Sequence, residues 1–121
     1  MISEEFVSNL LGMQFHQKYE IRALHLLLRE GYTLIAKDYR VGHHQADLVV
    51  KKLNVLYVVE VKYRKTIPEE AWQWVTSAQF YRLLKLGAGL LREHQCSELQ
   101  VLLVGFSNEL DTPLLLPLDV N

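Results

Sequence analysis

Cysteine is nearly absent from this chain of 121 residues, which contains Cys96 alone. One cysteine excludes an internal disulfide, and no Cys-x-x-Cys pair exists to bind zinc. We expect Cys96 to be a small buried residue. No apolar run approaches the roughly 18 residues that span a bilayer, and the acidic start Met-Ile-Ser-Glu-Glu is not typical of a signal peptide. We therefore expect a cytoplasmic protein that does not contact membranes.

The chain also lacks an excess of positive charge. Thirteen Lys and Arg residues face fourteen Asp and Glu residues, for a formal net charge of −1. This excludes a strongly basic nucleic-acid-binding composition. Locally the balance differs, because residues 37–65 contain seven basic and three acidic side chains, a sum of +4. The length and the mixed composition predict one globular domain over residues 1–121.

Several catalytic signatures are missing as well. The sequence contains no Walker loop, no Gly-x-Ser-x-Gly, no His-Glu-x-x-His and no zinc-ligand spacing. These absences argue against P-loop ATPases, serine hydrolases and the common zinc enzymes.

The patterns that are present predict helices and strands in alternation. Gly31 marks the expected left-handed cap of a first helix, and an apolar run at 99–106 is typical of a buried strand. The fold class is α/β, with a mixed four- or five-stranded sheet flanked by helices. The predicted helices are residues 4–30 and 67–94, and the predicted strands are 32–37, 46–52, 55–63, 99–106 and a short edge strand at 113–118.

The second and third strands form a predicted hairpin, because only Leu53-Asn54 separates them. A two-residue loop makes facing positions sum to 107, so that Asp47 lies opposite Glu60. A four-residue loop keeps this register and a three-residue loop destroys it. Facing side chains have Cβ atoms about 4.5–5.5 Å apart. Two such carboxylates repel unless one is protonated or a cation joins them, and Mg²⁺ prefers oxygen ligands of this kind.

Lys62 follows Glu60 by two residues and therefore lies on the same face of the strand. A lysine there would orient or deprotonate a water, or stabilise charge that develops on a phosphate. The alternative is a half-exposed strand that presents Glu60 and Lys62 to water as an ion pair. An Asp that faces a Glu with one Lys nearby is a poor salt-bridge arrangement, which favours the functional interpretation.

Each helix has a polar residue on its apolar stripe. Glu20 lies on the stripe of the first helix, and none of its neighbours at i±3 and i±4 is Lys or Arg. It either joins the carboxylate cluster or marks a point where the stripe meets water. Gln79 lies on the stripe of the second helix, where it either lines the site or is a buried amide. Trp72 and Trp74 are expected in the core and on the surface of that helix, or stacked on a base.

The spacing of these residues resembles a known nuclease signature. Asp47, twelve intervening residues and then Glu60-Val61-Lys62 resemble the Asp…Glu-x-Lys pattern of the PD-(D/E)XK nuclease superfamily. Within it, the chain is similar to the YraN family of small predicted endonucleases, which resemble archaeal Holliday junction resolvases. The resemblance covers about residues 12–92 and is carried by Glu20 with Ala23, Gly31-Tyr32, Arg40, Asp47-Leu48 and Val59-Glu60-Val61-Lys62-Tyr63-Arg64.

The resemblance implies a restriction-endonuclease-like core and a set of roles. Asp47 and Glu60 would bind Mg²⁺ or Mn²⁺, Lys62 would assist the attacking water, and Glu20 would complete the site. The sequence departs from the family pattern at His44-Gln45, where many relatives have Gly-Glu, and at Gln79, where many have Lys. Gln45 and Gln79 are therefore expected to line the site.

The predicted function is hydrolysis of DNA phosphodiesters, on duplex or branched DNA, with low sequence specificity. The side chains expected to contact phosphates are those near the hairpin ends: Arg40, His43, His44, Arg64 and Lys65. For the two histidines, plain solvent exposure is the alternative. Another hypothesis is a nuclease-fold DNA-binding or assembly module with weak or no catalysis, and a purely structural protein is a third. A homodimer that pairs residues 113–118 edge to edge is a further expectation.

Overall fold

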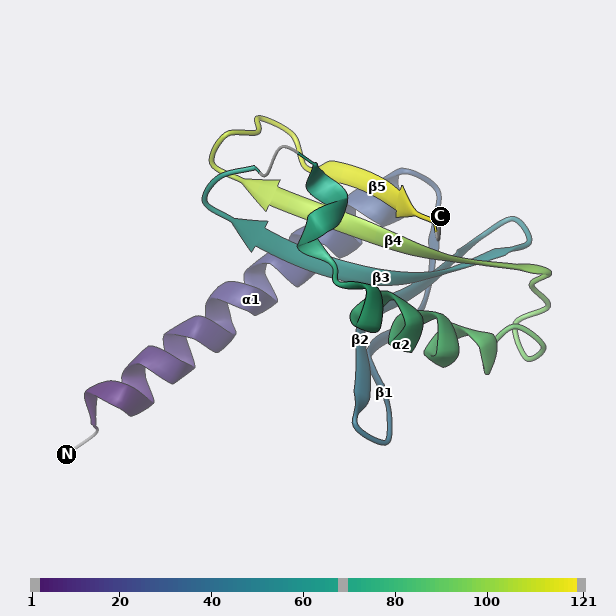
Figure 1. Ribbon diagram of the computed structural model, residues 1–121, viewed down its shortest axis with the longest axis horizontal. Coiled ribbons are helices and arrows are strands. Elements are labelled where there is room, and N and C mark those ends of the chain that lie inside the picture. Colours follow the sequence, from purple (N-terminus) through teal and green to yellow (C-terminus); the bar gives the residue numbers. More distant parts are fainter. Residues whose placement is uncertain (1–2, 68–69, 120–121) are drawn as a thin grey trace.

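The computed structural model describes residues 3–67 and 70–119 and forms a mixed five-stranded sheet between helices. A long helix α1 precedes three strands, a short 3-10 helix η1 and a second helix α2 follow, and two strands complete the chain (Figure 1). The bounds are α1 Glu4–Arg29, β1 Thr33–Val41, β2 His44–Lys52, β3 Val55–Arg64, η1 Ala71–Trp74, α2 Ser77–Ala88, β4 Glu98–Ser107 and β5 Leu114–Leu118.

The strands lie in the order β1-β2-β3-β4-β5. β3 and β4 are parallel and the other neighbours are antiparallel. The parallel pair needs a crossover connection, and η1 and α2 supply it. This arrangement confirms the predicted α/β class and is consistent with a restriction-endonuclease-like core.

The helices cover opposite faces of the sheet, α1 behind it and α2 with η1 in front in the view of Figure 1. Ala23 and Leu27 of α1 pack on one face, and Leu83 and Leu86 of α2 pack on the other. Both faces of β3 and β4 are therefore buried, which explains their near-continuous apolar sequences. The amino-terminal half of α1 projects beyond the sheet (Figure 1).

The expected cap at Gly31 is confirmed. Gly31 has φ +93°, its N–H donates to the carbonyl of Leu28, and the N–H of Tyr32 donates to the carbonyl of Leu27 at 3.0 Å. This pair of bonds is the Schellman motif, which requires a left-handed residue where glycine has no Cβ penalty. The cap turns the chain directly from α1 into β1.

The predicted register of the β2–β3 hairpin is also confirmed. Lys52 pairs with Val55 around the turn at Leu53-Asn54, and the ladder runs to Leu48 and Val59. Preceding it, β1 and β2 form a second hairpin that is longer than expected. Its turn is at Gly42-His43, where Gly42 has φ +61°.

The prediction of one helix over residues 67–94 is wrong. The segment instead contains η1, a break at Val75-Thr76 and the shorter α2. The Thr76 hydroxyl accepts a hydrogen bond from the N–H of Gln79 at 3.1 Å, so Thr76 caps α2 where a continuous helix was expected. At the other end, Gly89 caps the helix. The periodic apolar residues continue through both ends and conceal these breaks.

Across residues 3–67 and 70–119, no helix combines the length and apolarity needed to cross a membrane.

Candidate functional site

The candidate site lies where β2 separates from β3. The β2–β3 ladder ends at Leu48 and Val59, whereas β3 stays paired with β4 as far as Arg64. Just beyond the ladder, Asp47 Oδ2 accepts a hydrogen bond from the N–H of Val61 at 2.8 Å. The side chain thus satisfies a buried amide that the neighbouring strand no longer reaches. This hydrogen bond fixes the Asp47 carboxylate at the seam between the two strands.

The backbone of β1 is irregular at the same level. Asp38 would face Asp47 in the β1–β2 ladder, yet Asp38 has φ +49° and the pairing passes from Lys37 to Tyr39. On β2, Ala46 and Val49 pack on the face of the sheet that α2 covers, whereas Leu48 packs on the face that α1 covers. Residues 46 and 48 therefore lie on opposite faces, although the strict alternation of a strand would place them on the same face. The left-handed conformation of Asp38 and the change of face on β2 thus make both strands irregular beside Asp47.

β3 supplies the next two members of the cluster. Glu60 and Lys62 continue the face of Leu56 and Val58, on the side of α2. Glu60 is buried, with 7% of its surface exposed, and its Oε1 lies 3.1 Å from Lys62 Nζ. A half-buried lysine thus holds the carboxylate of Glu60 from the same strand.

Helix α1 approaches from the other face and adds Glu20 and His16. Glu20 is buried one turn before Ala23. His16 Nε2 lies 3.0 Å from Glu20 Oε1 and 3.5 Å from Asp47 Oδ1. His16 therefore bridges the helix carboxylate to the strand carboxylate.

His16 is a site residue that the sequence did not predict. No Lys or Arg lies three or four residues from Glu20, but a histidine at i−4 is also a partner for a helix ion pair. A His-x-x-x-Glu pair on a core-facing stripe is the signal that identifies it. The side chain of His16 is half exposed, so it also marks where solvent reaches the cluster.

Burial dominates the electrostatics of the site. Desolvation raises the pKa of Asp47 from 3.8 to about 6, the charge of Glu20 adds to the rise, and the hydrogen bond from Val61 opposes it. Desolvation likewise raises the pKa of Glu60, the charge of Asp47 contributes, and Lys62 opposes it. The charge of Asp47 therefore disfavours the charged form of Glu60, and the charge of Glu20 disfavours the charged form of Asp47.

The donor atoms suit a divalent cation. Among the described residues, one ligand atom each from His16, Glu20 and Asp47 lie within 4.8 Å of one another. Carboxylate oxygens are the ligands of Mg²⁺, and an added imidazole is compatible with Mn²⁺. Glu60, the predicted second ligand beside Asp47, turns its carboxylate to Lys62 instead. Glu20, Asp47, Glu60 and Lys62 thus share one neighbourhood, and their individual roles stay predictions.

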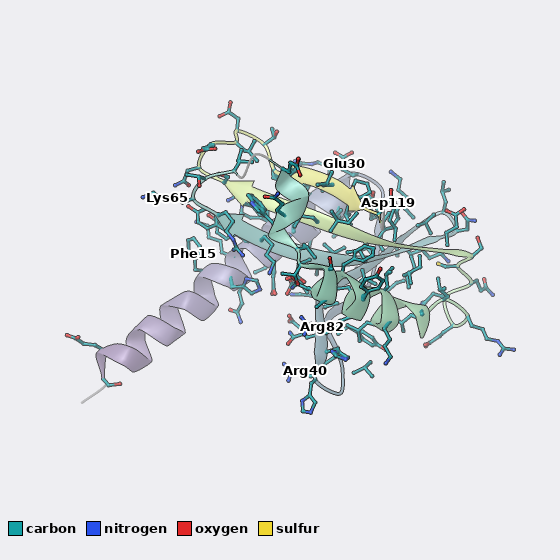
Figure 2. All side chains as sticks on the ribbon, viewed as in Figure 1. Phe15, Glu30, Arg40, Lys65, Arg82 and Asp119 are labelled. Carbon is teal, nitrogen blue, oxygen red and sulfur yellow. The ribbon has the colours of Figure 1, made fainter. Side chains whose placement is uncertain are left out.

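The predicted phosphate contacts form two groups, one at the β1–β2 turn and one at the end of β3. Arg40 and His43 are exposed at the β1–β2 turn, with the half-buried His44 beside them, and Arg64 and Lys65 are exposed at the end of β3. Figure 2 places Arg40 at the tip of the β1–β2 hairpin and Lys65 well apart from it. Because β2 and β3 are antiparallel, both groups belong to the sheet end that carries the carboxylates.

The two glutamines occupy different positions. Gln45 Oε1 accepts a hydrogen bond from Arg40 at 2.7 Å, so it belongs to the exposed hairpin and not to the buried cluster. Gln79 is half-buried in the first turn of α2. Within the described part of the chain, its side chain makes no hydrogen bond to the carboxylates. Its role as a site-lining residue stays a prediction.

Trp74 does not lie on the surface, as had been expected for one of the two tryptophans. It is 8% exposed and packs over Gly105, where a Cβ would collide with its ring. It is therefore not accessible for stacking on a base. The side chain of Trp72 lies outside the described residues. Cys96 is half-buried, and its Sγ lies 3.5 Å from the carbonyl of His94.

Comparison with known proteins places the chain in a family. The model of the uncharacterised protein family UPF0102 matches residues 19–104. A UPF0102 protein of Bradyrhizobium diazoefficiens is 36% identical over 75 residues, which cover 62% of this chain and 56% of that protein. A UPF0102 protein of Chloroherpeton thalassium is 32% identical over 87 residues, which cover 69% and 65% of the two chains.

A third relative, from Petrotoga mobilis, is 26% identical over 95 residues, which cover 75% of this chain and 84% of its own. Against the Bradyrhizobium relatives, the chain spans little more than half of their length. The matched region contains Glu20, Asp47, Glu60 and Lys62, whereas His16 lies just before it. The chain therefore belongs to UPF0102, the YraN-like family that its motifs predicted.

Proposed function

We propose that this protein is a metal-dependent DNA endonuclease that hydrolyses phosphodiester bonds with low sequence specificity. One observation carries the proposal. Three buried carboxylates from three separate elements converge at the seam between β2 and β3, and a lysine lies against one of them. A purely structural role does not account for this, because buried like charges are costly without a compensating cation.

Asp47 and Glu60 would hold Mg²⁺ or Mn²⁺, and Glu20 with His16 would complete the ligand set. The raised pKa values of Asp47 and Glu60 support this assignment, since a cation beside these carboxylates would favour their charged forms. When bound, the metal supplies charge neutralisation and a polarised water or phosphate oxygen.

The proposed role of Lys62 follows from the place of its ammonium group beside Glu60. Its Nζ lies 3.1 Å from Glu60, so the ammonium is held at the edge of the metal-binding carboxylates. There it orients the water that attacks phosphorus, or stabilises the negative charge that grows on the phosphate oxygens. The Lys62 side chain is 20% exposed and therefore reaches solvent, from which the attacking water comes.

The two basic groups beside the cluster would position DNA. Arg40, His43 and His44 lie next to the β1–β2 turn, and Arg64 and Lys65 lie at the end of β3. Contacts of this kind go to phosphates and carry no sequence information. They support binding to duplex or branched DNA without sequence selection. The homodimer and the cytoplasmic location stay predictions.

The test is cleavage of supercoiled plasmid and of a four-way DNA junction, first with Mg²⁺ and then with Mn²⁺. Asp47→Ala and Lys62→Ala are purified in parallel, and Lys85→Ala, an exposed change on α2, serves as the matched control. We expect cutting by the native chain and by the control, and a loss of about 100-fold or more in the two site variants.

Cutting of equal rate in all four preparations would identify a contaminating nuclease and overturn the proposal. Absence of cutting with retained binding in a gel shift would instead support the nuclease-fold DNA-binding module. The near-neutral charge of the chain is compatible with either outcome.

A further inference from the structure

A hollow of about 100 Å³ lies beside the carboxylate cluster, on the α1 side of the sheet. Its lining residues come from α1, from the end of β3 and from the segment that joins β4 to β5. Tyr19 and Tyr63 are the immediate chain neighbours of Glu20 and Lys62, so the hollow and the cluster share two backbone segments. It is lined by Tyr19, Arg22, Tyr63, Phe106, Ser107, Asn108, Leu110, Asp111, Thr112 and Pro113.

One wall of the hollow is aromatic. The rings of Tyr19 and Tyr63 stack with centroids 5.0 Å apart, and the ring of Phe106 lies 4.8 Å from that of Tyr19. The ring of Phe15 packs edge-to-face on this group, with its centroid 5.2 Å from that of Tyr63. Tyr19 and Tyr63 are only half-buried, so part of this aromatic surface faces the hollow. Such surfaces bind nucleobases by stacking, without sequence preference.

Arg22 adds a cation to the aromatic wall. Its guanidinium lies 5.0 Å from the Phe106 ring centroid and 5.4 Å from that of Tyr19. The side chain is exposed, and within the described residues no carboxylate pairs with it. A guanidinium plane held in this way stacks on a base or contacts its phosphate.

The opposite wall is polar and held in place. Asn108 Oδ1 accepts a hydrogen bond from the Tyr63 hydroxyl at 3.0 Å, which leaves its amide hydrogens for another acceptor. Ser107 fixes the base of this segment, since its hydroxyl donates to the carbonyl of Lys65 and accepts from the N–H of Glu109. Asp111 and Thr112 are exposed at the rim and offer further hydrogen bonds.

From these features we infer that the hollow binds one unpaired nucleobase of the DNA substrate, next to the phosphate at the cluster. This rests on the proposed function and specifies its substrate as branched or bulged DNA. The hollow of about 100 Å³ is open at its rim, so a base would insert one edge from the side while the rest of the ring stays outside. A base inside a duplex cannot enter it, because its faces are already stacked.

The test measures binding without cleavage, with Ca²⁺ in place of Mg²⁺. One duplex carries a fluorescent 2-aminopurine as a single-nucleotide bulge, and a second carries it paired with thymine. Anisotropy of an end label gives affinity, and 2-aminopurine emission reports stacking. We expect the native chain to bind the bulged duplex about fivefold or more tightly and to quench its emission, as stacking of one base predicts.

Two variants test the hollow itself. Thr112→Tyr places a ring into it from the exposed rim, and Arg22→Gln removes the guanidinium. Both are expected to reduce the preference for the bulge to less than about twofold. Glu93→Tyr, an equally bulky change at an exposed position outside the hollow, is expected to keep it. Circular dichroism of each variant verifies folding.

Equal affinity for the two duplexes, or a bulge preference that survives both variants, would overturn the inference. The two proposals fail separately. Metal-dependent cutting without a bulge preference would retain the nuclease and remove the base pocket. A bulge preference that Thr112→Tyr abolishes, in a protein that cuts no DNA, would retain the pocket and remove the nuclease.

Discussion

At the scale of single residues, Asp47 combines two opposing influences. Its carboxylate accepts the N–H of Val61, which favours the charged form, and it is buried beside Glu20, which disfavours it. The second influence is the larger, because the pKa rises to about 6. An ordinary structural aspartate that caps a backbone amide has a lowered pKa. The raised value distinguishes Asp47 as part of a charge cluster.

The raised pKa predicts how stability depends on pH in the absence of metal. A carboxyl group with a higher pKa in the folded state binds its proton more tightly there, so the fold is stabilised by protonation. Stability therefore falls as the pH rises from 3.8 to about 6 and stays reduced above that range. The difference between a pKa of 3.8 and one of about 6 corresponds to about 3 kcal/mol as an upper limit.

We expect Asp47→Asn to raise the free energy of unfolding by about 1–3 kcal/mol at pH 7.5 with EDTA, and by much less at pH 4.5. Urea denaturation at both pH values measures this. Asp119→Asn, at an exposed carboxylate, is the control and should change little. A loss of stability in Asp47→Asn that is the same at both pH values would show that the Val61 hydrogen bond outweighs the charge effect.

A bound divalent cation should reverse this cost. We expect Mg²⁺ or Mn²⁺ to stabilise the native chain by about 2.7 kcal/mol when the free ion is at 100 times its Kd. Thermal unfolding with the ion and with EDTA at matched ionic strength measures the gain. Asp47→Asn and Glu60→Gln together should abolish it. An equal gain in that double variant would place the ion at another site.

At the scale of elements, the site depends on the separation of β2 from β3 and on the crossover through α2. β3 extends five residues beyond the last β2 pair at Val59, so Glu60 and Lys62 lie where β3 has no paired residue on β2. The crossover returns the chain to β4 alongside β3. This return requires the end of α2 to lie close to the sheet. Gly87 makes the close approach possible because it has no Cβ.

Gly87 is predicted to be intolerant of a methyl group. A Cβ there would collide with the side chain of Leu99 and lie 2.6 Å from Val58 Cγ2. We expect Gly87→Ala to destabilise the fold by about 1–3 kcal/mol in urea denaturation, although alanine favours helices in general. Gly89→Ala is the matched control, since its Cβ would meet nothing closer than the Leu86 carbonyl at 3.7 Å. Equal effects of the two changes would contradict close helix–sheet packing at Gly87.

At the scale of the whole molecule, the basic stretch 37–65 does not form one surface. Lys51 Nζ donates to the carbonyl of His94, and Lys52 Nζ donates to that of Glu30, both at 2.8 Å. These two lysines lie at the Leu53-Asn54 turn, at the far end of the hairpin from Arg64. The positive charge that remains near the cluster is therefore smaller than the sequence sum of +4.

DNA affinity should depend on the residues at the cluster end alone. We expect Lys65→Gln and Arg64→Gln each to weaken binding and to lower the slope of log affinity against log salt by about 1. Fluorescence anisotropy with a mixed-sequence duplex at several salt concentrations measures the slope. Lys85→Gln, an exposed change near the end of α2, should leave it unchanged. A common effect of all three changes would indicate a diffuse electrostatic attraction.

The sequence by itself determined the elements of the sheet, the Gly31 cap and the hairpin register as far as Leu48 and Val59. These features depend on local properties: period-two alternation, turn length and the backbone freedom of glycine. It did not determine where the second helix breaks, because the apolar stripe continues past Thr76 and Gly89, which cap the two ends of α2.

The tertiary structure alone decided which partners meet at the site. His16 joins Glu20 and Asp47 because α1 crosses the sheet at the level where β2 leaves β3, and no local pattern encodes that crossing. The same holds for the hollow, where Tyr19, Tyr63 and Asn108 come together from segments that are distant in sequence. Contacts between such segments depend on how the elements pack, which spacing along one chain cannot specify.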